Sequence, residues 1–104
     1  MRLLFDSRGK FIAREEGGRL YSLAGGNIGH YLRGEGVFID QRGCYLGEVV
    51  RGNRLMDNLS SPHRAAAFAV PGAYGGSGTI GDPGSAGAVG PVEGYQDIPP
   101  ESLE

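Results

Sequence analysis

The stretch FDSRGKFIA, residues 5–13, places an aspartate three residues before a glycine and surrounds both with apolar segments. The same pattern recurs as IDQRGCYLG at residues 39–47 and as LYSLAGGNIG at residues 20–29, where Ser22 replaces the aspartate. A fourth copy begins with LMD at residues 55–57 but has Ser60 where the turn glycine is expected. The period of 16 to 18 residues indicates one supersecondary unit that is used repeatedly.

Each copy predicts the turn of a β-hairpin. A short polar side chain at the first turn position accepts hydrogen bonds from the backbone two residues on, and glycine at the fourth position takes a positive φ. The predicted turn residues are Asp6, Gly9, Ser22, Gly25, Asp40 and Gly43. Spaced aspartates also occur in metal and nucleotide sites, but the chain has no GxxxxGKS or GxxxxGKT phosphate loop. We therefore interpret these residues as structural.

The segments between the repeated turns predict an all-β antiparallel meander. Glycine-bearing spacers at residues 15–19, 33–36 and 51–54 suit tight reversals, so about seven short strands fit between residues 2 and 57. A small residue recurs at one strand position in each copy, namely Ala13, Gly29 and Gly47. Glycine inside a strand is expected where backbones or side chains approach closely. These three residues are therefore predicted to lie together near a common axis.

The segments LFDSRG, LYSLAG, FIDQRG and LMDN resemble the repeats of the bacterial four-fold β flower proteins. In that family, consecutive hairpins are arranged around a pseudo-four-fold axis. The resemblance covers residues 2–58 and implies a hairpin-repeat domain over residues 1–59. Because the family has no assigned activity, the resemblance implies no catalytic residue and no cofactor.

The second half of the chain has a different composition. Residues 60–71, SSPHRAAAFAVP, combine a Ser-Pro helix-start signal with a run of alanines, which predicts one short helix followed by a connector. Residues 72–92 contain glycine at every third position from Gly72 to Gly90. This collagen-like Gly-X-Y period is typical of polyproline II geometry and predicts an arm of about 65 Å at ~3.1 Å per residue.

Three alternatives remain open for the arm. With only Pro83 and Pro91 in its seven triplets, a free triple helix would be marginal, because its glycine-rich chains lose much backbone entropy on ordering. The arm is then a trimeric stalk, a strand docked on a hairpin domain of its own or another chain, or a flexible linker. A docked arm is attractive because fewer than ~60 residues bury only about 60% of their unfolded surface.

Residues 93–104, EGYQDIPPESLE, read as an acidic anchor peptide or as a disordered tail. Tyr95 and Ile98 are spaced as two apolar anchors of an extended peptide that adds to an exposed sheet edge. We expect Asp97 to lie near arginines of the hairpin domain, whose net charge is opposite. A homo-oligomer formed through the arm is the predicted assembly.

Charge and composition narrow the classes of partner. Residues 1–64 hold ten Lys and Arg against seven Asp and Glu, a balance of about +3, whereas residues 65–104 hold five acids and no Lys or Arg. This division favours self-association over nucleic-acid binding, which usually needs a strongly basic face. The weaker alternative is a nucleic-acid interface of four arginines with a tyrosine as stacking platform: Arg8, Arg42, Arg51 and Arg54, with Tyr21, Tyr31 or Tyr45.

The sequence shows neither a targeting signal nor the residue spacing of a metal site. The chain shows no secretory signal and no stretch near the ~20 apolar residues of a membrane helix, so we expect a cytoplasmic protein that does not bind membranes. Its lone Cys44 excludes an internal disulfide framework. Its two histidines and one cysteine lack the close spacing of a zinc site. We predict no metal and no cofactor.

One cluster offers a catalytic alternative. Arg14, His30 and Glu48 occupy the same repeat position, directly after the small residue, and a glutamate that orients a histidine is a familiar acid-base pair. No nucleophile takes the matching position, and such a trio also forms cross-strand polar clusters. We therefore predict a non-enzymatic structural or protein-interaction module, with a small-ligand or hydrolytic protein that uses this trio as the alternative.

Overall fold

The computed structural model describes residues 1–73 and 75–104, so Tyr74 of the predicted arm lies outside the described residues. Its backbone forms eight strands and one 3-10 helix, η1 (Pro100–Leu103). The strands are β1 (Arg2–Phe5), β2 (Phe11–Glu16), β3 (Arg19–Tyr21), β4 (Asn27–Leu32), β5 (Val37–Asp40), β6 (Tyr45–Val50), β7 (Arg54–Asn58) and β8 (Tyr95–Asp97).

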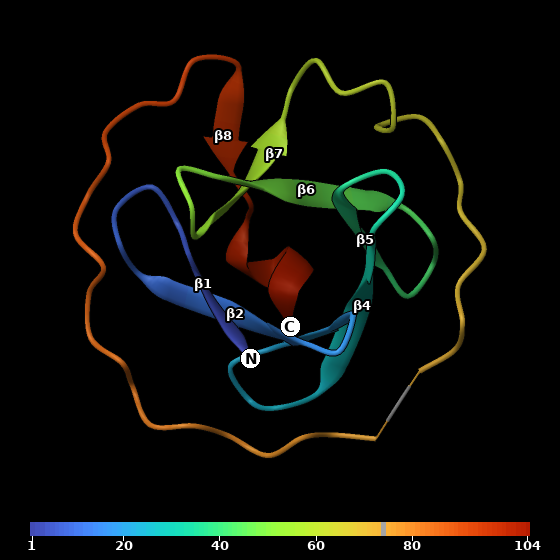
Figure 1. The fold of residues 1–104 in the computed structure, drawn as a ribbon, viewed down its shortest axis with the longest axis horizontal. Helices are drawn as coiled ribbons and strands as arrows, with labels where there is room; N and C mark the ends of the chain where they lie inside the picture. The colour runs from blue at the N-terminus through green and yellow to red at the C-terminus, as the bar shows by residue number, and fades with distance from the viewer. Residues whose placement is uncertain (74) are drawn as a thin grey trace.

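Strands β1 to β7 form a closed antiparallel barrel (Figure 1). Each strand pairs with its neighbour in the chain, and β1 also pairs in parallel with β7, where Phe5 lies opposite Arg54. β8 then adds to β7 in the antiparallel sense, with Met56 opposite Asp97. These pairings confirm the predicted all-β meander of antiparallel hairpins. Closure pairs β1 with the start of β7, and β8 covers the rest of that edge of β7, at Met56–Asn58.

Three hairpins share one β-bulge that the sequence did not reveal. Leu4 pairs with Ala13, Leu20 with Gly29 and Phe38 with Gly47, and the register shifts immediately after each of these pairs. The extra residue in the bulged strand is Ile12, Ile28 or Leu46. A bulge bends its strand and increases the local twist, so its recurrence curves the sheet toward closure.

The small residues beside the bulges lie where the backbone is crowded. A Cβ on Gly29 would lie 2.1 Å from the Ile39 carbonyl oxygen, and one on Gly47 would lie 2.6 Å from that of Met56. Ala13 is fully buried in the hydrophobic core. Each position therefore lacks room for a larger residue.

The core is built from equivalent positions of the repeat. Leu4, Leu20, Phe38 and Leu55 each directly precede the residue before the turn Asp or Ser, and all four are fully buried. Ile98 and Leu103 join the same cluster from the C-terminal segment. In Figure 1, η1 lies inside the ring of strands, so Leu103 closes the core from one side.

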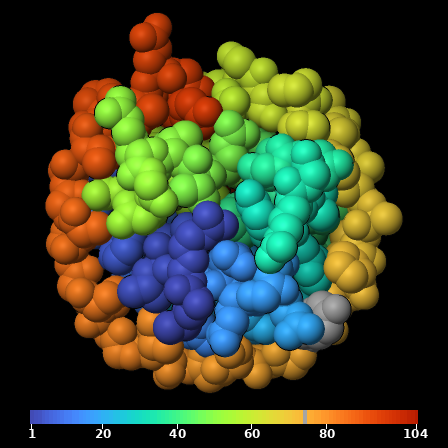
Figure 2. All heavy atoms as spheres, viewed as in Figure 1, coloured from blue at the N-terminus to red at the C-terminus, as the bar shows by residue number. Residues whose placement is uncertain are grey.

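Residues 59–73 and 75–94, which we call the encircling segment, run around the outside of the barrel (Figures 1 and 2). Backbone N–H groups of Phe68, Ser77 and Ala86 donate to the carbonyl oxygens of Gly43, Gly25 and Gly9 at 3.0, 2.9 and 3.0 Å. The segment thus meets the hairpin turns in reverse order, once every nine residues. Because this segment curves around its own barrel, the predicted arm of about 65 Å remains within a molecule that measures 34 × 33 × 23 Å.

The helix predicted within residues 60–71 is wrong. These residues form turns and an isolated bridge between Cys44 and Ala67, while the 3-10 helix lies at Pro100–Leu103. The Ser61 hydroxyl accepts a hydrogen bond from the His63 N–H at 3.1 Å, and the Phe68 N–H bonds to Gly43. These local and tertiary bonds override the helix propensity of the alanines, which is high but small in free energy compared with tertiary interactions.

The backbone of the arm also differs from polyproline II. Five of the seven glycines of the Gly-X-Y period have positive φ, between 73° and 103°, whereas polyproline II keeps φ near −75°. The five are Gly72, Gly78, Gly84, Gly87 and Gly90. Glycine takes this region at no steric cost, and the positive angles let an extended chain bend around the barrel.

Replacing Gly47 by valine should lower the free energy of unfolding by about 1 to 3 kcal/mol through overpacking, because its Cβ also meets the Ile98 Cδ1 atom at 2.9 Å. Gly34→Val is the matched control, since a Cβ on Gly34 would have no atom within 4 Å and its φ is not positive. Urea unfolding measures both variants. Equal stability losses would contradict the close packing at Gly47.

Candidate functional site: the ring of hairpin turns

The three repeated turns have nearly identical hydrogen bonds. The Gly9, Gly25 and Gly43 N–H groups donate to the carbonyl oxygens of Asp6, Ser22 and Asp40 at 3.1, 3.0 and 3.1 Å. The Asp6 Oδ1 atom accepts from the backbone N–H groups of Arg8 and Lys10, both at 2.9 Å. Asp40 accepts from Arg42 and Cys44 in the same way. The Ser22 hydroxyl replaces the carboxylate with one bond, from Gly26 at 3.3 Å.

The turn glycines touch the encircling segment. Their φ angles are 89°, 92° and 84°, in the left-handed region that favours glycine. A Cβ on Gly43 would lie 2.1 Å from the Phe68 carbonyl oxygen, one on Gly25 2.4 Å from that of Gly78, and one on Gly9 2.6 Å from the Gly87 nitrogen. Each turn therefore requires its glycine for two reasons, the positive φ angle and the close approach of a second backbone.

Two buried arginines bind the encircling segment from the barrel side. Arg14, which is 2% exposed, donates through Nη2 to the carbonyl oxygens of Ser77 and Gly78 at 3.1 and 2.6 Å. Its guanidinium also lies 5.3 Å from the centre of the Tyr21 ring, a cation–π contact. Arg54 donates through Nη2 to the Ala86 carbonyl at 3.1 Å, and its Nη1 reaches the Asp6 and Gly87 carbonyls.

The predicted trio of Arg14, His30 and Glu48 is divided among separate partners. Arg14 binds the encircling segment, and the His30 Nε2 atom lies 3.1 Å from the Gln41 Oε1 atom. Glu48 accepts hydrogen bonds from the hydroxyls of Tyr45 and Tyr95 at 3.1 and 2.8 Å and from the Asn58 amide at 3.1 Å. Arg14 and Glu48 therefore tie the barrel to the encircling and C-terminal segments, whereas His30 contacts a turn within the barrel.

The C-terminal segment is anchored at the three residues that the sequence singled out. The Tyr95 hydroxyl donates to Glu48, and Ile98 is 7% exposed within the core. Asp97 accepts from the backbone N–H and the hydroxyl of Ser7 at 2.8 and 2.6 Å. Asp97 was expected to lie near arginines, and it lines the same hollow as Arg8, the residue after Ser7. Among the ion pairs of residues 1–73 and 75–104, none includes its carboxylate, which is bound by Ser7.

Sequence reasoning gave Arg54, Ser7 and Gln41 no part in these contacts. Arg54 is the last residue of the spacer at 51–54, and Ser7 occupies a variable turn position, so neither stands out in the repeat. Gln41 occupies the same variable turn position as Ser7 and bridges Asn27 and His30. No sequence signal identifies these contacts, because the partners named here lie 11 to 90 residues away.

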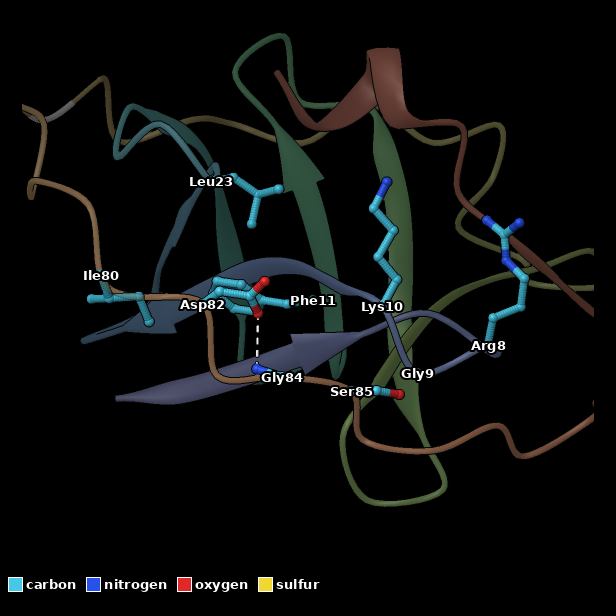
Figure 3. Close-up of a pocket in the computed structure, with 9 residues that line it drawn as sticks. All are labelled: Arg8, Gly9, Lys10, Phe11, Leu23, Ile80, Asp82, Gly84 and Ser85. Atoms are coloured by element: carbon cyan, nitrogen blue, oxygen red, sulfur yellow. Dashed lines mark hydrogen bonds between the residues drawn. The ribbon is translucent and has the colours of Figure 1, made fainter.

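Two hollows flank the turn between β1 and β2. One, of about 520 Å³, lies between this turn and the encircling segment and includes Phe11, Leu23 and Ile80 (Figure 3). The other, of about 500 Å³, lies between the same turn and the C-terminal segment. Arg8, Lys10 and Leu23 line both hollows, and none of the predicted trio lines either.

Comparison of the chain with protein-family models, with curated proteins and with solved structures finds no match. The resemblance to the four-fold β flower proteins therefore stays a prediction. Within the described part of the chain, no three His, Cys, Asp or Glu side chains are arranged to hold a metal ion. None of the helices described there is long and apolar enough to cross a membrane.

Alanine at Gly43 should destabilise the protein more than alanine at Gly52. Both glycines have φ near 85°, so both substitutions carry a left-handed strain of about 1 to 2 kcal/mol. Only Gly43 meets the encircling segment, since nothing lies within 4 Å of the Gly52 position. Hydrogen exchange at Phe68 should increase in the Gly43 variant alone. Equal exchange in both variants would contradict a docked segment.

Alkaline pH should weaken the fold through Tyr45. Burial, followed by the nearby Glu48 charge, raises the pKa of Tyr45 to about 12 from 10. Because the folded pKa is the higher one, the stabilisation is complete below pH 10 and is lost as the pH rises toward 12. Tyr45→Phe should flatten this loss of the free energy of unfolding. Identical pH profiles of wild type and variant in urea titrations would contradict the assignment.

Proposed function

We propose that this protein is a non-enzymatic structural and protein-interaction module that self-assembles through its arm. Its hairpins would form a pseudo-four-fold set whose turns receive an extended Gly-X-Y chain. The observation that carries the proposal is the pairing of Phe68, Ser77 and Ala86 with three turn glycines at nine-residue intervals. A second copy of the chain is the proposed partner.

The chemistry of the turn ring supports binding of an extended backbone. The turns offer carbonyl oxygens, and Arg14 and Arg54 offer buried guanidinium donors to the carbonyls of the arriving chain. All of these contacts reach main-chain atoms. The turn glycines are what permits this approach, because a Cβ on Gly9, Gly25 or Gly43 would overlap the backbone of the arriving chain. That chain presents glycines at two of the turns, Gly78 at Gly25 and Gly87 at Gly9, but Phe68 at Gly43.

The fourth hairpin supports exchange between copies. β7 carries the fourth repeat, and its partner β8 arrives only after residues 59–94. A connection of this length adds little closure entropy, because that cost grows only logarithmically with loop length. Tyr95, Asp97 and Ile98 can therefore dock on their own β7 or on that of a second copy, which is the geometry of domain swapping.

The hydrolytic alternative has less support. Arg14 and Glu48 hold other segments, and neither of the two hollows beside the first turn is lined by Arg14, His30 or Glu48. An enzyme needs a concave site that holds its reacting groups together with a substrate.

A new disulfide tests whether the encircling segment exchanges between copies. Cys44 is the Cα partner of Ala67 in the isolated bridge, and directly opposed residues of antiparallel strands lie within the distance that a disulfide spans. An Ala67→Cys variant, refolded and then oxidised, should form an internal disulfide in dilute solution. At high protein concentration it should form covalent dimers, which a non-reducing gel resolves.

Ala65→Cys is the matched control, because Ala65 is exposed and has no bridge partner in the described structure. It should give little of either product. Wild-type protein reports any dimer that arises from Cys44 alone. If Ala67→Cys remains monomeric after refolding at every concentration, the encircling segment binds only its own barrel and the self-assembly hypothesis is rejected.

A further inference from the structure

The barrel holds the C-terminal segment, residues 95–103, as it would hold an extended peptide. β8 adds to the edge of β7, with Asn58 opposite Tyr95 and Met56 opposite Asp97. This is the geometry of β-strand addition, in which main-chain hydrogen bonds give affinity and pockets for side chains give specificity. We call the barrel side of this contact the socket. It is formed by Ser7, Gly47, Glu48 and the β7 residues Met56–Asn58.

Two polar contacts of the socket select particular side chains of the segment. The Asp97 carboxylate accepts hydrogen bonds from the Ser7 backbone N–H at 2.8 Å and from the Ser7 hydroxyl at 2.6 Å. The Tyr95 hydroxyl donates to the Glu48 Oε1 atom at 2.8 Å. Charge-assisted hydrogen bonds of this kind are roughly twice as strong as neutral ones. The socket therefore specifies an aspartate that follows a hydroxyl donor by two residues.

Two apolar side chains and two prolines complete the segment. Ile98 is 7% exposed and Leu103 is 5% exposed, and both belong to the core of the barrel. Between them, Pro99 has φ −57° and ψ 137°, and Pro100 begins η1. Proline fixes its own φ and favours an extended residue before it. A peptide of this sequence is thus preorganised, and it loses less conformational entropy on binding than an ordinary peptide.

The C-terminal segment fills its site incompletely. The hollow of about 500 Å³ is lined by Ile98, Pro99 and Leu103 from the segment and by Leu23 from the second turn. Leu23 is 45% exposed. Well-packed protein interiors leave few voids larger than a water molecule. A competing peptide with larger side chains at the two proline positions would fill this space and bury Leu23, so the present occupant is replaceable by a tighter one.

We propose that the socket is a peptide-binding site, and that an extended peptide of a partner protein displaces the tethered C-terminal segment from it. The partner peptide carries an aspartate directly before a branched apolar residue and a leucine five residues after that residue, as Asp97, Ile98 and Leu103 do. This inference rests on the proposed interaction function, whose ligand it names. It requires neither a second copy of the chain nor exchange of the encircling segment.

The tether sets the concentration at which a partner peptide competes. A flexible tether holds its ligand at an effective concentration on the order of 1 mM, and docking of the encircling segment raises that value. Weakening the tethered segment alone lowers the apparent dissociation constant of a free peptide, because it increases the fraction of open sockets. Weakening the socket alone affects the tethered and the free peptide alike, so the two effects cancel. The informative variant therefore carries its first change in the segment.

A synthetic peptide of residues 93–104 is the probe, and the full-length Asp97→Asn variant is its receptor. Asparagine removes the charge that Ser7 binds but keeps the shape of the side chain, so the tethered segment should bind about tenfold more weakly. Fluorescence anisotropy of the labelled peptide should give a dissociation constant of about 0.1 mM, against about 1 mM or higher for the wild type. The NMR resonance of the Ser7 amide should shift during the titration.

Matched controls use the same contact. An Asp97→Asn version of the peptide should bind the Asp97→Asn protein about tenfold more weakly than the natural peptide does. Adding Ser7→Ala to that protein should weaken binding of the natural peptide by a similar factor. Adding Ser77→Ala instead should leave it unchanged, because Ser77 is exposed and belongs to the encircling segment.

Circular dichroism verifies that each variant is folded. If Asp97→Asn does not fold, Tyr95→Phe takes its place, because it removes only the hydrogen bond of the segment to Glu48.

Three results would each overturn the proposal. These are unchanged anisotropy at about 1 mM of the Asp97→Asn protein, tenfold above the expected constant, equal binding of the natural and Asp97→Asn peptides, and unchanged affinity after the addition of Ser7→Ala. The peptide contains no part of residues 59–92, so it measures binding at the socket alone. The disulfide experiment measures exchange of the encircling segment, and each hypothesis can therefore fail without the other.

Discussion

The encircling segment can lie on the barrel only because each turn that it crosses presents a glycine. At Gly43, Gly25 and Gly9 the second backbone comes so close that a single added carbon would overlap it. The carbonyl groups of these three glycines accept the hydrogen bonds that fix the register of the segment. Each such bond contributes about 0.5–1.5 kcal/mol. Three of them guide the chain, and the apolar anchors Ile98 and Leu103 add about 1.5–3 kcal/mol each.

Two buried arginines lie at the interface between the barrel and the encircling segment. Arg14 and Arg54 are almost fully inaccessible to water, and both use their donors on carbonyl oxygens rather than carboxylates. A buried guanidinium is costly unless its donors are satisfied. Peeling the segment away exposes Arg14 to water but removes two of its acceptors. Arginine suits this position, because its planar fork offers five donors and stays charged.

The sequence was most informative where structure is local. The Asp-x-x-Gly spacing around Gly9 and Gly43 specifies a turn within four residues, so hairpins and meander could be predicted. The bulges at Ile12 and Ile28 could not, because register follows from closure of the whole sheet. The helix predicted near Ala66 is wrong for a similar reason. The Phe68 N–H, which that helix would use, donates to the carbonyl oxygen of the distant Gly43. Arg14, His30 and Glu48 share a repeat position, yet equivalent places in the chain have different neighbours outside the barrel.

The chain order of the last hairpin has a kinetic consequence. Strands β1 to β7 pair with their neighbours in sequence, and contacts of short separation form rapidly. β8 reaches β7 only after the encircling segment has passed three turns. Until then, the edge of β7 and the space later filled by Ile98 and Leu103 stay open to water. Such exposed edges and apolar surfaces attract other chains during folding. The newly made barrel is therefore most vulnerable to aggregation in the interval before its own C-terminal strand arrives.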